Sequence, residues 1–160
     1  MDKLLVKANA TADDKWNRLV DALYSEESYD NIVLNHLLTA LDFYNEVASG
    51  GFEGVLEAYE EQIDEDGINA TKEAIAESLN YIGADRAAGI VSSTFPTLKN
   101  AMEKYDRALE NRELTQVQEE GFVITFNNVM KKYRNLGDGY LHDKIVNFIS
   151  ENDQELFSIE

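Results

Sequence analysis

The sequence predicts an all-α protein, a compact single-domain helical bundle of about seven or eight helices that spans residues 1–160. Three observations support this fold class. Apolar residues recur at three- and four-residue steps along most of the chain, which is the period of an amphipathic helix. No segment shows the alternation of apolar and polar residues that is typical of a half-buried strand. A chain of 160 residues with 44% hydrophobic content is long enough for one core and short for two.

The first predicted helix runs from Ala12 to Tyr24, with Thr11 as its N-cap. Its apolar face includes Trp16, which we interpret as a core anchor. The next is a central helix of roughly 20 residues that stops at the paired glycines Gly50 and Gly51. The apolar stripe of this central helix consists of Leu34, Leu37, Leu38, Leu41, Tyr44, Val47 and Ala48.

A further helical stripe follows the paired glycines and continues to an acidic turn at Gly67. Its apolar members are Phe52, Val55, Leu56 and Tyr59. The next helix covers Ala70 to Tyr81 and ends at Gly83, which can adopt the left-handed conformation of a helix C-cap. We expect one side of that helix to carry Ala74, Ile75, Leu79 and Ile82.

The only proline divides the following segment into two predicted helices. Asp85 is expected to cap a short helix that ends at Ser92 or Ser93, and Pro96 is expected to open a helix from Thr97 to Leu109 near its first turn. Two more helices complete the chain on either side of a glycine-rich turn. Their stripes consist of Phe122, Phe126, Val129, Met130 and Tyr133, and of Leu141, Ile145, Phe148 and Ile149.

The composition excludes several classes of protein. The absence of cysteine excludes disulfides and thiolate chemistry, and it removes the commonest ligands of structural zinc. The longest apolar runs are far shorter than a transmembrane helix. The first seven residues lack the apolar core and cleavage site of a secretory signal, so we expect a cytoplasmic protein.

The charge of the chain restricts its partners. With 14 Lys+Arg against 31 Asp+Glu, the formal net charge is -17, which disfavours direct binding to nucleic acids and to anionic membranes. The same charge attracts basic proteins. The alternative interpretation is that the acidity only keeps the protein soluble.

Three motifs together resemble those of one bacterial domain family. A helix ends in Asn45-Glu46-Val47-Ala48-Ser49-Gly50-Gly51-Phe52, and another ends in Leu79-Asn80-Tyr81-Ile82-Gly83-Ala84. The segment from Tyr133 to Tyr140, followed by Phe148, Ile149, Asn152 and Phe157, is similar to aromatic C-terminal helices. Over roughly residues 30–157 the chain therefore resembles a family, otherwise largely of unknown function, that includes a Neisserial DNA-mimic protein.

The resemblance implies a protein that presents carboxylates where DNA presents phosphates, and it also implies a homodimer. One departure from the family pattern concerns the residues after the paired glycines. Family members often carry a glutamine and then aromatics there, whereas this chain has Glu53-Gly54-Val55-Leu56. The paired glycines themselves are explained by structure alone, because they permit a positive φ at a helix end.

A run of acids supplies the candidate partner-binding residues, which we call the acidic ridge. It consists of Glu53, Glu57, Glu60, Glu61, Asp64, Glu65 and Asp66, with no basic residue among them. On a single helix, the steps of three and four would place most of them on one side, roughly 5 to 6 Å apart along the axis. Further acids that could extend this surface are Asp42, Glu46, Glu73, Glu77, Glu119 and Glu120. An alternative is that the ridge is only the solvated face of a surface helix.

Metal binding and catalysis have weaker support. The segment from Gln62 to Glu73 partly overlays a calcium-binding EF-hand loop, but Gln62 replaces the first aspartate. The two histidines, His36 and His142, belong to no recognisable catalytic motif, although Asp143 lies next to His142. We therefore predict no metal, no cofactor and no enzymatic activity.

The sequence thus favours an acidic protein-binding domain, with a DNA mimic that occupies a basic transcription regulator as the leading hypothesis. The alternatives are an inhibitor or immunity-type protein for a basic nuclease or toxin, a structural domain with incidental acidity, and an undetected hydrolase. A deep polar cleft around His36 or His142 would favour the hydrolase.

Overall fold

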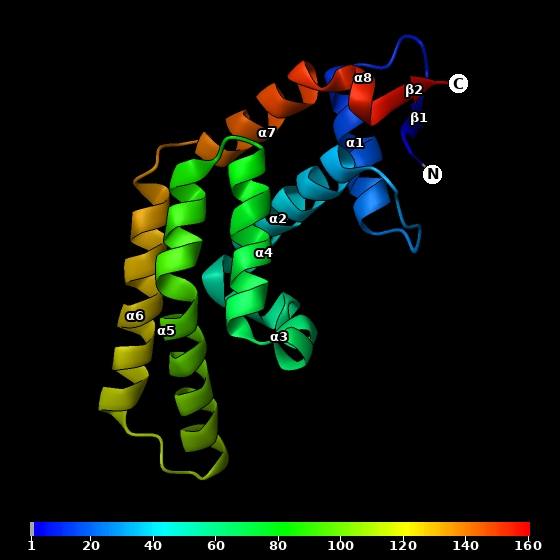
Figure 1. Cartoon of the computed structure of the whole chain (residues 1–160). Coiled ribbons are helices and arrows are strands. Elements are labelled where there is room, and N and C mark those ends of the chain that lie inside the picture. The colour runs from blue at the N-terminus through cyan, green and yellow to red at the C-terminus, as the bar shows by residue number, and fades with distance from the viewer. Residues whose placement is uncertain (1) are drawn as a thin grey trace.

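Helices make up most of the computed structural model, which describes residues 2–160 and confirms the all-α fold class. Figure 1 shows how they are arranged. The helices are α1 (Ala12–Leu23), α2 (Ile32–Ala58), α3 (Glu60–Asp66), α4 (Ile68–Tyr81), α5 (Asp85–Glu110), α6 (Gln116–Arg134), α7 (Tyr140–Glu151) and the four-residue α8 (Asp153–Leu156). No helix among these described residues is long and apolar enough to cross a membrane.

The two ends of the chain form a small parallel sheet that the sequence analysis did not predict. Strand β1 (Leu4–Val6) pairs with β2 (Phe157–Ile159), and Leu4 lies opposite Phe157 in the register. Each strand has three residues, too few to show an alternating pattern. The prediction that the chain has no strand is wrong here, because only the tertiary fold brings the two segments together.

Helix α1 begins where the sequence predicts. The side chain of Thr11 accepts a hydrogen bond from the Asp14 backbone N–H, and the Asp14 carboxylate accepts one from the Thr11 N–H, which completes a capping box. Trp16 is only half-buried, and its ring lies 5.9 Å from that of Tyr44 and 5.3 Å from that of His142. The interpretation of Trp16 as a core anchor therefore needs correction, because this side chain lies at the edge of the core.

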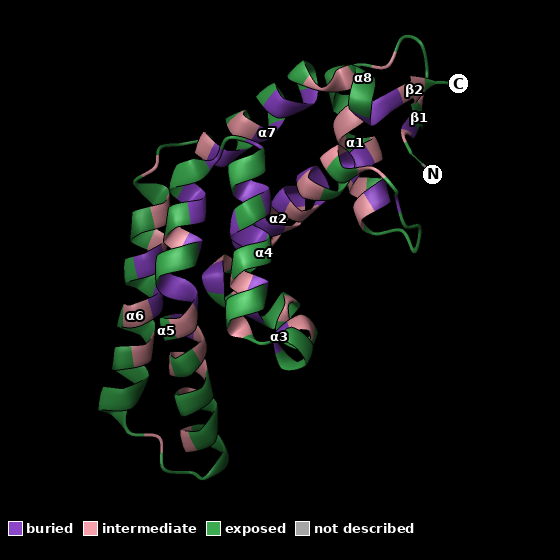
Figure 2. Cartoon of the chain, viewed as in Figure 1, coloured by how far each residue is buried: buried purple, intermediate pink, exposed green. Residues whose placement is uncertain are grey.

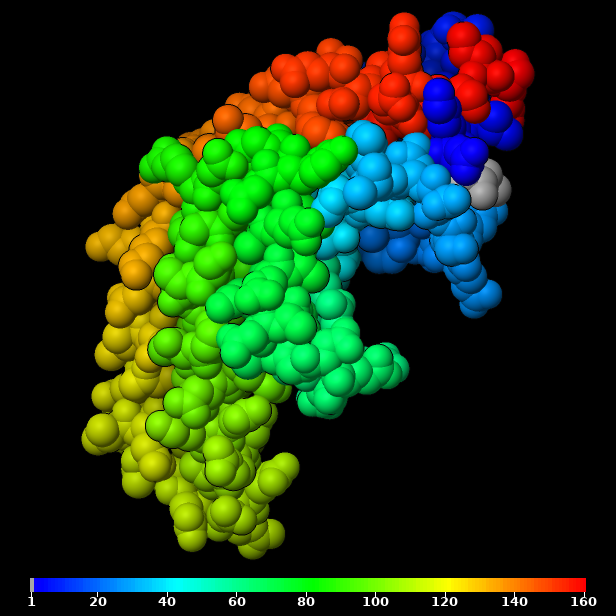
Figure 3. Space-filling view, in the orientation of Figure 1, coloured from blue at the N-terminus to red at the C-terminus, as the bar shows by residue number. Residues whose placement is uncertain are grey.

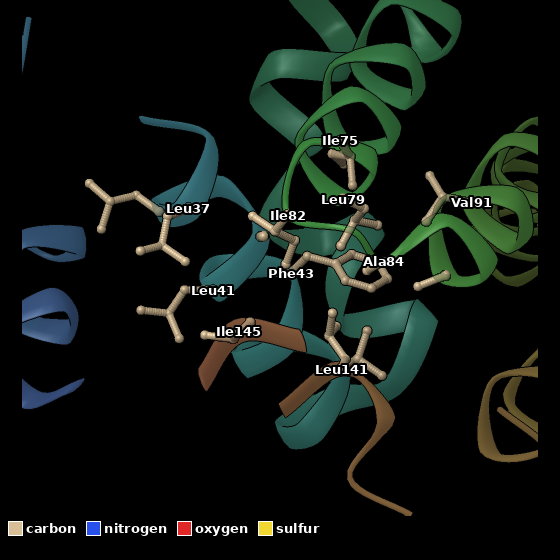
Figure 4. Close-up of a cluster of buried hydrophobic side chains, with 14 of the residues drawn as sticks. Leu37, Leu41, Phe43, Ile75, Leu79, Ile82, Ala84, Val91, Leu141 and Ile145 are labelled. Carbon is tan, nitrogen blue, oxygen red and sulfur yellow. The ribbon is translucent and has the colours of Figure 1, made fainter. Parts of the chain in front are cut away.

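Helix α2 is the centre of the molecule. It packs against α1, α4, α6, α7 and α8, and its predicted stripe faces the core except for Ala48, which is exposed. Figure 4 shows Leu41 and Phe43 of α2 surrounded by side chains of α4 and α7, and Figure 2 shows that the buried residues follow the inner faces of the helices. The buried residues of α2 are Leu34, Leu37, Leu38, Ala40, Leu41, Phe43, Val47, Phe52, Val55 and Leu56.

Helix α4 starts at Ile68, two residues before the predicted start, and ends at the predicted glycine. Gly83 has a φ of 85°, and the N–H groups of Gly83 and Ala84 donate to the carbonyls of Asn80 and Leu79, which is a Schellman cap. Ala74 is exposed, so the prediction that it lies on the buried face of this helix is wrong.

Pro96 lies inside α5 and does not open a helix, so the predicted division of this segment is wrong. A proline inside a helix costs about 3 kcal/mol because one backbone hydrogen bond is lost and its ring clashes with the preceding turn. Val91, Phe95 and Leu98 are fully buried around it. Burial of large apolar side chains at about 1.5 to 3 kcal/mol each outweighs that cost, so packing keeps the helix continuous.

The last two long helices agree with their predicted stripes. Phe126 and Val129 of α6 are buried, as are all four predicted stripe residues of α7. The turn between these helices has positive φ at both Gly137 and Gly139. Helices α5 and α6 lie side by side, and their far halves extend beyond the other helices as a hairpin (Figure 1).

Candidate functional site

The paired glycines set the direction of the chain that carries the acidic ridge. Gly50 continues the helix, whereas Gly51 has a φ of 63° and a ψ of -162°, a conformation essentially restricted to glycine. The following Phe52 is buried, and its ring makes edge-on contacts with Phe43, Phe95 and Tyr133 at 5.9, 6.1 and 5.7 Å between centroids. The turn at Gly51 thus inserts Phe52 into the core and redirects the helix after it.

All seven residues of the acidic ridge are exposed, but they do not lie on one helix. Glu53 and Glu57 belong to α2, and the other five belong to α3. The helix is interrupted at Tyr59, whose φ of -97° and ψ of 10° are not helical. The prediction of a single continuous helix is therefore wrong. Figure 3 shows the segment of α3 projecting from the body of the molecule.

A half-buried pair lies at the interruption at Tyr59. Its hydroxyl lies beside the carboxyl of Asp42 on the preceding part of α2. Burial raises the pKa of Asp42, and the Tyr59 hydroxyl partly offsets this by favouring the charged form. Burial and the nearby charges of Asp42 and Glu46 raise the pKa of Tyr59 far above its ordinary value, so the phenol stays protonated. Asp42 is thus half-buried beside Tyr59, and contrary to the prediction it does not extend the exposed acidic surface.

The structure adds one carboxylate that the sequence analysis missed. Burial raises the pKa of Glu53, and the negative charges of Glu57 and of Asp106 on α5 raise it further, so Asp106 lies close to the ridge. Glu103, Asp106 and Glu110 recur at helical steps on α5. That spacing was visible in the sequence, but only the packing of the helices brings Asp106 near enough to act on Glu53.

The remaining acids named in the sequence analysis are more dispersed. Glu73 and Glu77 are exposed on α4, and Glu119 and Glu120 are exposed near the start of α6, at the free end of the α5–α6 hairpin. The charge pattern around the ridge is nevertheless strongly one-sided. No lysine or arginine occurs between Arg18 and Lys72, a stretch that contains 13 Asp+Glu.

Packing and helix dipoles hold this charged segment in place. Like charges at neighbouring helical positions cost a few tenths of a kcal/mol per pair, roughly 0.2 to 0.5. Ile63 of α3 is buried, which contributes about 1.5 to 3 kcal/mol. Glu60 and Glu61 lie in the first turn of α3, where the positive end of the helix dipole favours them, whereas Asp64, Glu65 and Asp66 lie between its negative end and the positive N-terminus of α4. The fold therefore tolerates the concentration of negative charge.

The EF-hand overlay does not correspond to a loop. Gln62 to Asp66 lie within α3, and α4 begins directly after Gly67. A calcium loop needs its alternate side chains to converge on one point, which a helix does not allow. Within residues 2–160, no group of three or more His, Cys, Asp or Glu side chains is arranged to hold a metal ion.

The two histidines have different surroundings. His36 Nδ1 lies 2.9 Å from Ser78 Oγ, and its ring stacks on that of Tyr81 with 4.2 Å between centroids, so His36 is packed against α4. His142 is exposed, with its Nδ1 3.4 Å from Asp143 Oδ1, and it lies at a pocket formed by α2, α6 and α7.

Comparisons with protein-family models, with curated proteins and with solved structures gave no match. The resemblance to the DNA-mimic family therefore remains an expectation from the three motifs.

Proposed function

We propose that this domain binds a basic protein through the acidic ridge and acts as a DNA mimic that occupies the DNA-binding surface of its partner. One observation carries the proposal. All seven ridge carboxylates are exposed, and none of them forms an ion pair with another residue in the described range 2–160. They are therefore available to the lysine and arginine side chains of a partner.

The mechanism is competition for those basic side chains. Arginine and lysine groups that contact phosphates in DNA form equally suitable charge-assisted hydrogen bonds with carboxylates. The negative charge of Asp106 on α5 also acts on Glu53, so the proposed surface includes this carboxylate. The interaction should weaken steeply with salt, since most of its free energy comes from charges at the protein surface.

The test is capture of partners from a lysate of the source organism at low salt with two charge-matched variants. The ridge variant carries Glu57→Gln, Glu60→Gln, Glu61→Gln and Asp64→Asn. The control variant carries the same number of neutralised acids at exposed positions on or near α1, α7 and α8, namely Asp21→Asn, Glu26→Gln, Glu151→Gln and Glu155→Gln. Both variants lose the same charge, so a difference between them reports the position of the charges.

The proposal predicts that the wild type and the control variant capture a basic DNA-binding protein, that added duplex DNA releases it, and that the ridge variant does not capture it. Equal loss with both variants would show that only the overall charge matters. If the captured protein is a nuclease or toxin bound through its catalytic surface, and no DNA-binding regulator is captured, the inhibitor hypothesis is supported instead.

A further inference from the structure

A pocket with a volume of about 490 Å³ lies where the turn of α2 faces the junction of α6 and α7. Two of the motifs singled out in the sequence meet there, because its lining includes Gly51 and the segment from Met130 to Tyr140. A Cβ atom at Gly51 would lie 3.4 Å from Met130 Sδ, so the side chain of Met130 on α6 packs directly against the turn. The size is within the range of small-molecule sites, roughly 300 to 1,000 Å³.

Two phenol groups in this pocket lack a protein partner. Of the three lining tyrosines, only Tyr140 has a hydrogen-bonded hydroxyl within residues 2–160, which accepts from the Arg86 backbone N–H at 3.2 Å. The side chains of Tyr44 and Tyr133 lie close enough to interact electrostatically, and burial raises the pKa of Tyr133 to about 12, so it remains a neutral donor. No buried side-chain oxygen or nitrogen in the described range lacks a partner, so both hydroxyls are open to solvent and can donate to a ligand that displaces water there.

The pocket also holds a positive charge in a strongly negative protein. Arg134 lines it and forms no ion pair among the described residues, and Lys131 and Lys132 lie in the same last turn of α6. Asp138 is the one carboxylate in the described lining. The surroundings therefore differ from the acidic ridge, where no basic residue is present.

We propose that this pocket binds a small organic anion, in which a carboxylate or phosphate is attached to a flat apolar body. The guanidinium of Arg134 pairs with the oxyanion, since its planar donors match two anion oxygens. The hydroxyls of Tyr44 and Tyr133 donate to the same group or to a polar edge of the body. Met130 and the aromatic rings cover the apolar body.

The test is a titration of the isotope-labelled protein with phenyl phosphate, with benzoate and with inorganic phosphate, followed by amide NMR. Gly51, Gly137 and Gly139 supply amide signals at the pocket, and the ring of the sole tryptophan, Trp16, lies 5.3 Å from that of His142 for a fluorescence readout. Phenyl phosphate and benzoate are expected to shift these glycine signals saturably. Inorganic phosphate, which lacks the apolar body, should bind at least about tenfold more weakly.

Three variants separate the pocket from general charge effects. Arg134→Gln should weaken binding about tenfold, whereas Lys132→Gln, which removes the same charge from the same turn outside the pocket lining, should change it by less than about twofold. Ala48→Phe fills the pocket from an exposed helical position and should abolish binding without removing a charge.

The proposal is overturned if neither organic anion shifts the glycine signals up to about 10 mM. It is also overturned if the two charge variants weaken binding equally, or if the shifts centre on another part of the surface. Because Arg134 and Ala48 are exposed, an unchanged amide spectrum of the free variants shows that they have kept their fold.

Discussion

The turn at Gly51 gives the sharpest prediction about stability, because its neighbour Gly50 is a matched control. Gly51 has a φ of 63°, whereas Gly50 is helical and a Cβ atom there would meet nothing within 4 Å. Substituting alanine at these adjacent positions should therefore change the free energy of unfolding in opposite directions. The Cβ atom at Gly51 would meet only Met130 at ordinary contact distance, so backbone strain dominates.

The magnitudes follow from the two backbone conformations. Gly51→Ala forces an L-residue into a region that costs about 1 to 3 kcal/mol. Gly50→Ala removes the entropic disadvantage of glycine in a helix and should stabilise by about 0.5 to 1 kcal/mol. In a domain of this size 1 kcal/mol corresponds to about 2 to 4 °C in melting temperature.

Urea denaturation followed by circular dichroism measures both changes. We expect a lower midpoint for Gly51→Ala, a higher midpoint for Gly50→Ala, and a similar dependence on denaturant for both. If Gly51→Ala were as stable as Gly50→Ala, the argument that the turn requires glycine would be refuted, and with it the account of how the ridge is directed.

Three further predictions concern other parts of the chain. Pro96→Ala should raise the free energy of unfolding by about 2 kcal/mol, measured by thermal melting. Alanine regains roughly 3 kcal/mol of helix propensity, while the greater freedom of the unfolded chain costs up to about 1 kcal/mol. Unchanged stability would mean that α5 accommodates the proline without cost. Thr11→Ala should lower the free energy of unfolding in urea by about 1 kcal/mol, whereas Thr11→Ser should leave it nearly unchanged. Equal losses with alanine and serine would exclude a contribution from the capping box. Burial raises the pKa of Asp42 and of Glu53, so the folded state binds a proton at these carboxyls more tightly than the unfolded state does. Their contribution to the free energy of unfolding should therefore rise as the pH falls from about 7 toward their ordinary pKa values of 3.8 and 4.5. Asp42→Asn should reduce this rise, and an unchanged pH profile of stability in that variant would contradict the assignment.

The helices with wide apolar stripes were predictable from sequence. The boundaries of α1, the stripe of α7 and the cap at Gly83 follow from local rules of periodicity and capping, which need no knowledge of the tertiary structure. The turn at the paired glycines was predictable for the same reason, since only glycine adopts the required φ without strain.

The features that were not predicted depend on packing between distant segments. The proline rule fails at Pro96 because buried neighbours outweigh its local cost. The sheet between β1 and β2 exists only because the ends of the chain meet.

Much of the candidate site could also be predicted, since the seven ridge acids were identified from their spacing and are all exposed. The interruption at Tyr59 was not predicted, because neither glycine nor proline marks it in the sequence. The proximity of Asp106 to Glu53 was missed because it arises from the packing of α5 against the rest of the fold.

Displacement of DNA from a basic partner tests directly whether the acidic ridge takes the place of DNA. A fluorescently labelled duplex is first bound to the basic protein captured from the lysate. The anisotropy of the duplex is then followed as the acidic domain is added. The account predicts that the wild type and the control variant release the duplex, that the ridge variant does not, and that release weakens as salt is raised. Release of the duplex by the ridge variant at the same concentrations as the control, or no release by the wild type, would contradict it.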